Sequence, residues 1–118
     1  MALTEQLPVY RDVYRLITIV FQVTQNYPRD YKYSLGQDMK RDSLKLVRSI
    51  YRANRSASKR EWLEDFLDDF EILKLEIRLS VDLHLLPLRK QSEMSPLLES
   101  IGKQVTAWKN AGTHYLKG

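Results

Sequence analysis

At 118 residues, with 43% hydrophobic and 29% charged content, the chain is long enough to bury one hydrophobic core and balanced enough in charge to fold. It contains no Cys, which excludes disulfides, zinc–thiolate sites and thiol catalysis. The net charge of +4 permits an anionic partner without requiring one. We expect one domain over residues 1–118, with no signal peptide and no membrane-spanning segment.

Apolar residues repeat at helical spacing along most of the chain, so we predict an all-α fold, an up-and-down four-helix bundle. The first helix should run from about Pro8 to Asn26, because Pro suits a first turn. Its main apolar face should comprise Tyr10, Val13, Tyr14, Ile17, Val20, Phe21 and Thr24. A loop from Tyr27 to Tyr33 should follow, because the residue before Pro28 avoids helical geometry.

The second helix should open on a capping box of Ser34 and Gln37, whose side chains would satisfy free backbone N–H groups. It should reach about Asn54. Its core side should comprise Leu35, Met39, Leu46, Val47, Ile50 and Tyr51.

The third helix should open on a second capping box, Ser58 with Glu61, and end near Leu86, before Pro87. Its apolar residues form two lines, one comprising Leu63, Phe66, Phe70, Leu73 and Ile77 and the other comprising Ile72, Leu75, Leu79 and Leu83. The first helix likewise carries Val9, Leu16, Ile19 and Val23 beside its main face. Either these wide apolar faces build a thick core, or the surplus face is covered by self-association.

The fourth helix should bury Met94, Leu97, Leu98, Ile101, Val105 and Trp108 and stop near Gly112, which suits a helix end. Two starts remain open. Either Pro96 lies in the first turn after a Ser95 cap, or the helix begins near Arg89 and Pro96 kinks it.

Basic residues concentrate on the second predicted helix. Residues 29–60 contain ten cations and three anions, whereas residues 61–86 contain two cations and eight anions. Five of the cations, Arg41, Lys45, Arg48, Arg52 and Arg55, recur at spacings of four, three, four and three, which places them on one side of the helix. The candidate site also includes Arg29, Lys32 and Lys40 towards the loop. Such a row can follow a phosphate backbone without reading bases.

Two alternatives weaken this interpretation. The third helix should run antiparallel to the second, so its acidic residues could neutralise the row; they are Glu61, Glu64, Asp65, Asp68, Asp69 and Glu71. The tyrosines Tyr27, Tyr31 and Tyr33 alternate with cations and could stack on bases, although we expect them to close the open end of the bundle.

Catalytic motifs are scarce. Neither histidine follows a Glu by three residues, as a carboxylate-bridged metal site in a bundle requires, and the four glycines are too scattered for a phosphate-binding loop. Arg78 and His84 are similar to the Arg-x4-6-His signature of the HEPN ribonucleases, but Leu79 stands where that family has a polar residue. We therefore expect no catalytic residue, no metal and no cofactor, with a HEPN-like ribonuclease and a purely structural oligomer as alternatives.

The segment Tyr27–Gly36, followed by Met39 and the basic helix, resembles the four-helix-bundle proteins encoded in intervening sequences of ribosomal RNA genes. It resembles more closely the accessory variability determinant (Avd) proteins of diversity-generating retroelements. Ile101, Gly102 and Trp108 also match the last helix of that group, so the resemblance spans nearly the whole chain.

The resemblance implies a non-catalytic cytoplasmic protein, bacterial or phage-encoded, that forms a barrel-shaped homopentamer. It implies binding to the reverse transcriptase and to RNA, with DNA as a further ligand, in support of mutagenic cDNA synthesis. The basic row would then contact phosphates, with Arg11 and Arg15 as lesser candidates. Pro96 departs from the family, in which a helix usually continues at that place.

Overall fold

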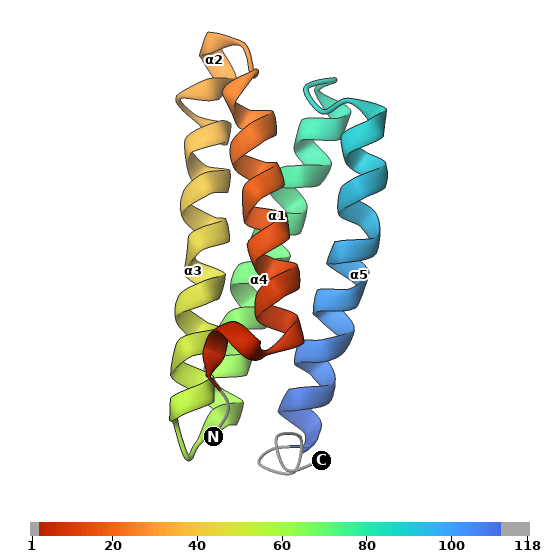
Figure 1. Ribbon diagram of the computed structural model, residues 1–118. Coiled ribbons are helices and arrows are strands. Elements are labelled where there is room, and N and C mark those ends of the chain that lie inside the picture. Colours follow the sequence, from red (N-terminus) through yellow and green to blue (C-terminus); the bar gives the residue numbers. More distant parts are fainter. Residues whose placement is uncertain (1–2, 112–118) are drawn as a thin grey trace.

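The computed structural model describes residues 3–111, and its regular structure there is entirely helical (Figure 1). Four long helices run alternately up and down: α1 (Pro8–Gln25), α3 (Leu35–Arg55), α4 (Lys59–Asp82) and α5 (Leu88–Ala111). A short 3-10 helix, η1 (Thr4–Gln6), precedes them, and a short helix, α2 (Arg29–Lys32), joins α1 to α3. The four long helices form the predicted four-helix bundle, which measures 45 × 23 × 20 Å.

Each long helix packs against two others. Helices α1 and α4 both pack against α3 and against α5, so α1 and α4 stand diagonally across the bundle (Figure 1). Because directions alternate around the bundle, α1 and α4 also run parallel to each other. No helix within residues 3–111 is long and apolar enough to cross a membrane.

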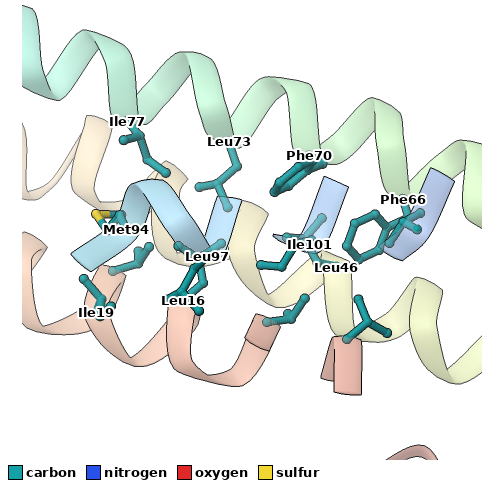
Figure 2. Packing of buried hydrophobic residues seen from close by; sticks show 14 of the residues in the cluster. Leu16, Ile19, Leu46, Phe66, Phe70, Leu73, Ile77, Met94, Leu97 and Ile101 are labelled. Carbon is teal, nitrogen blue, oxygen red and sulfur yellow. The ribbon is translucent and has the colours of Figure 1, made fainter. Parts of the chain in front are cut away.

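Large apolar side chains from all four long helices meet along the axis of the bundle. In Figure 2, Phe66 and Phe70 of α4 lie close to Leu46 of α3 and Ile101 of α5. Each fully buried side chain of this size contributes about 1.5 to 3 kcal/mol through the hydrophobic effect. Most predicted core positions on the last three helices are buried, whereas four are only half-buried: Leu35, Val47, Tyr51 and Leu98.

The buried face of α1 differs from the predicted one. Its buried residues are Val9, Val13, Leu16, Ile19, Val20, Val23 and Thr24, which include all four of the supposed surplus residues. Tyr14 and Phe21, which were predicted for the core, are 59% and 42% exposed. The apolar side chains of α1 span too wide an arc for spacing alone to select the inner face, and packing against α3 and α5 selects the aliphatic side.

The predicted loop before α3 contains α2, which begins after Pro28. The Pro28 carbonyl accepts hydrogen bonds from the N–H groups of Tyr31 and Lys32, at 2.9 and 2.8 Å. Proline restricts the residue before it and leaves the following residues free to form a helical turn. The buried Tyr27 confirms in part the prediction that tyrosines close this end of the bundle, whereas Tyr33 is 63% exposed.

Neither predicted capping box forms. The Ser34 hydroxyl donates to the Asp30 carbonyl at 2.7 Å, because α2 ends directly before α3 and offers that acceptor first. Ser58 likewise makes no side-chain cap. The Lys59 ammonium instead donates to the Ala53 and Ser56 carbonyls at the end of α3, at 2.8 and 2.9 Å. A cation at this position also suits the helix dipole of α3.

Helix α4 ends at Asp82, four residues before the predicted end, in a Schellman motif. The N–H of His84 donates to the Val81 carbonyl at 3.0 Å, and the N–H of Leu85 donates to the Ser80 carbonyl at 2.9 Å. His84 adopts a φ of 60°, the left-handed conformation that this motif requires. The motif lets the chain reverse before Pro87.

Helix α5 begins at Leu88 and continues through Pro96, so the early start is correct. Pro96 is exposed to solvent. Because proline has no N–H, the Ser92 carbonyl lacks its helical donor. The predicted stop at Gly112 lies outside the described residues.

Candidate nucleic-acid interface

The basic row on α3 lies along the outer side of that helix. Arg41, Lys45, Arg48 and Arg55 are exposed, and Arg52 is half-buried. Because α3 stays helical from Leu35 to Arg55, the five side chains keep the spacing expected from the sequence over about 21 Å.

The upper part of the row is neutralised within α3 itself. The Arg41 guanidinium lies 3.1 Å from an Asp38 carboxylate oxygen and 3.3 Å from one of Asp42, and the Lys45 ammonium lies 3.6 Å from Asp42. The charge of Asp42, and its hydrogen bond, raise the pKa of Arg41. Sequence reasoning missed these two carboxylates, although their spacing of three from a cation signals a helical ion pair.

The middle of the row borders a groove of about 460 Å³ between α3 and α4. Lys45, Arg48 and Ser49 line it from α3, and Trp62, Asp65, Asp68 and Asp69 line it from α4. Three of the six acidic residues suspected of neutralising the row therefore lie beside it. Burial raises the pKa of Asp69, and the charge of Lys45 opposes that shift. Glu64 pairs with Arg60, and Glu71 pairs with Lys74, all on α4.

The lower part of the row, Arg48, Arg52 and Arg55, differs from the upper part in its pairing, although Arg48 also borders the acidic groove. Within residues 3–111, no carboxylate lies within 4.0 Å of the cationic nitrogens of Arg48, Arg52 or Arg55. The Arg52 guanidinium lies over the Trp62 ring, 5.1 Å from its centroid. Such stacking fixes the guanidinium plane and leaves its edge free to bind a phosphate oxygen.

The other predicted cations do not extend the row. Arg29 is exposed on α2, and Lys32 and Lys40 line a different groove, between α1 and α3. The Lys40 ammonium lies 5.7 Å from the centroid of the Phe21 ring. Arg11 and Arg15, the lesser candidates, are exposed on α1. The structure thus divides the candidate set into a row on α3 and separate cations near α1 and α2.

A buried carboxyl pair joins α3 to α4 behind the basic row. Asp42 is 5% exposed and Glu76 is 9% exposed, and their side chains share a hydrogen bond. Burial, reinforced by this hydrogen bond and by the charge of Asp42, raises the pKa of Glu76 to about 8. The raised pKa favours the protonated form of Glu76, beside Asp42, which Arg41 and Lys45 contact from outside.

The ribonuclease alternative finds little support in this geometry. Arg78 is exposed on α4, where its guanidinium lies 3.8 Å from Asp82. His84 lies beyond the helix, and its backbone conformation completes the Schellman motif. Among the described residues, no three His, Asp or Glu side chains gather into a group able to hold a metal ion.

Comparison with known proteins agrees with the resemblance noted above. The sequence model of the bAvd-like family matches residues 5–111, which include the four long helices and the whole basic row. No curated protein matches the chain. A family match over so much of the chain establishes membership, and the chain therefore belongs to the bAvd-like family.

Proposed function

We propose that this protein is a non-catalytic accessory factor of a diversity-generating retroelement. It self-associates, binds the reverse transcriptase of the element, and holds nucleic acid through the basic row of α3 during mutagenic cDNA synthesis. Membership of the bAvd-like family carries the proposal. Members of this family are accessory proteins. We place this role in the bacterial cytoplasm, whether the gene is carried by the bacterium or by a phage.

The lower part of the basic row supports the nucleic-acid role. Arg48, Arg52 and Arg55 project from one side of a continuous helix, and no carboxylate among the described residues pairs with them. Guanidinium groups spaced along a rigid helix favour phosphate contacts over base contacts, so we expect little sequence preference. We propose RNA as the main nucleic-acid ligand and DNA as a further one.

Salt dependence tests this assignment. We would replace Arg48, Arg52 and Arg55 together by Gln and measure binding to a single-stranded RNA by fluorescence anisotropy at several salt concentrations. Three lost phosphate contacts should reduce the log-log salt slope by about 2, since each contact on a single strand contributes about 0.7. Replacing Arg41 and Lys45 by Gln should change the slope less, because both already pair with carboxylates.

Replacing Arg78, Arg89 and Lys103 together by Gln is the matched control, since these three cations are exposed and lie on other helices. If the triple variant of the basic row shows the far-UV circular dichroism of the folded protein and its salt slope for RNA binding is unchanged, the basic row does not bind the RNA. Co-purification with the reverse transcriptase of the same element, compared between wild type and the triple variant, then shows whether polymerase or nucleic acid uses this surface.

A further inference from the structure

Two apolar surfaces remain uncovered on helices that stand diagonally across the bundle (Figure 1). The first, here called the α4 face, comprises Ile72, Leu75, Leu79 and Leu83, which are 50%, 62%, 43% and 37% exposed. The second, here called the α1/α3 groove, has a volume of about 540 Å³ and is lined mainly by Tyr14, Ile17, Phe21 and Leu44, with Lys32 and Lys40 beside them. A monomer leaves both surfaces in water, at a cost in free energy.

The two surfaces are complementary in shape and charge. The α4 face is a ridge of aliphatic side chains on one helix, whereas the α1/α3 groove is a depression between two helices. Exposed acidic side chains, Glu71 and Asp82, lie on α4 beside its face and pair with Lys74 and Arg78 of the same helix, whereas the charged groups that line the groove are the ammonium groups of Lys32 and Lys40. Pairing unlike surfaces brings the carboxylates of α4 to the ammonium groups of the groove, whereas pairing the groove with itself brings like charges together.

The two surfaces also lie at the same height along the bundle. Helices α1 and α4 run parallel, and Phe21 and Leu79 lie about 6 Å and about 4.5 Å from the C-terminal ends of their helices. Arg11 on α1 and Asp68 on α4 each lie about 21 Å from those ends. A neighbouring copy can therefore be placed by rotation about an axis parallel to the helices, with no shift along that axis. Its apolar residues then meet the apolar residues of the first copy, and Arg11 of one copy lies at the height of Asp68 of the other.

We propose that the α4 face of one copy docks into the α1/α3 groove of the next copy of this chain. The proposal rests on the self-association included in the proposed function and specifies which surfaces carry it. Such contacts are heterologous, because each copy contributes two different surfaces. Repetition of the contact closes into a ring wherever the rotation between neighbours permits, and the basic row belongs to neither surface.

Two complementary variants test the pairing. Leu75→Glu places a charge on the α4 face and leaves the groove intact, and Leu44→Glu does the reverse. Both side chains are more than half exposed, so both variants should fold. In native mass measurement, each variant alone should give the 14.0 kDa monomer, whereas the wild type gives a larger assembly. A mixture of the two should give a one-to-one dimer and nothing larger, because it contains a single intact pair of surfaces.

The exposed Ala107→Glu on α5 is the control and should assemble as the wild type does. If either glutamate variant loses helical circular dichroism, Leu75→Ser and Leu44→Ser apply the same test with a smaller change. Assembly of either single variant to the wild-type mass, or a mixture that stays monomeric, overturns the pairing while self-association stands. A monomeric wild type overturns the pairing and the proposed self-association together, and the anisotropy measurement still decides RNA binding separately.

Discussion

Replacing Glu76 by Gln tests the buried carboxyl pair between α3 and α4. Glu76 has a pKa raised to about 8, from an ordinary value of 4.5, mainly by burial and then by its hydrogen bond to Asp42. The folded protein therefore holds a proton that the unfolded chain releases above pH 4.5. Gln keeps the size of the side chain and an N–H donor for Asp42, but it cannot ionise.

The sign of the effect follows from proton binding. Between pH 4.5 and pH 8 the folded state binds more protons than the unfolded state, so the free energy of unfolding falls as pH rises. The loss is complete above pH 8. At about 1.36 kcal/mol per pKa unit, the upper bound of the loss is roughly 5 kcal/mol. Relaxation of the surrounding structure around the ionised carboxyl group lowers this cost, and we expect about 2 to 3 kcal/mol.

Urea unfolding followed by circular dichroism at pH 5, 7 and 9 measures this difference. Wild type and Glu76→Gln should agree within about 1 kcal/mol at pH 5, and the variant should be more stable by about 2 to 3 kcal/mol at pH 9. Glu71→Gln is the control, since that carboxylate is exposed and pairs with Lys74, and its difference from wild type should stay nearly constant. A difference between wild type and Glu76→Gln that does not change from pH 5 to pH 9 would refute the reasoning.

Three further substitutions have stability effects that urea unfolding can measure. Phe66→Ala should lower the free energy of unfolding by about 3 to 5 kcal/mol, because the side chain is fully buried and leaves a cavity; a loss below about 1 kcal/mol would contradict the described core. His84→Gly should raise stability by about 1 kcal/mol, because Gly adopts a φ of 60° without strain; a decrease would show that the imidazole makes a stabilising contact. Pro96→Ala should raise stability by about 1 to 3 kcal/mol by restoring a helical hydrogen bond inside α5, and no gain would mean that a bend at this position improves packing.

Features set by residues close in sequence were predictable. The four long helices, the division of α4 into a buried and an exposed apolar line, and the one-sided basic row all follow from periodicity, because a helix brings together residues three and four apart. The resemblance carried by the segment Tyr27–Gly36 also led to the family that the comparison supports. Local capping was less predictable, since Ser34 and Ser58 compete with nearby acceptors and donors for the same hydrogen bonds.

The sequence alone determined that the chain forms helices and where its charges and apolar residues recur along them. Only the tertiary structure decided which side of α1 faces inward, leaving Tyr14 and Phe21 in a groove, and which cations of α3 pair with carboxylates. Only packing brought Glu76 against Asp42, far apart in sequence. The physical reason is that helical hydrogen bonds form within a few residues, whereas burial and charge pairing depend on which distant helices meet.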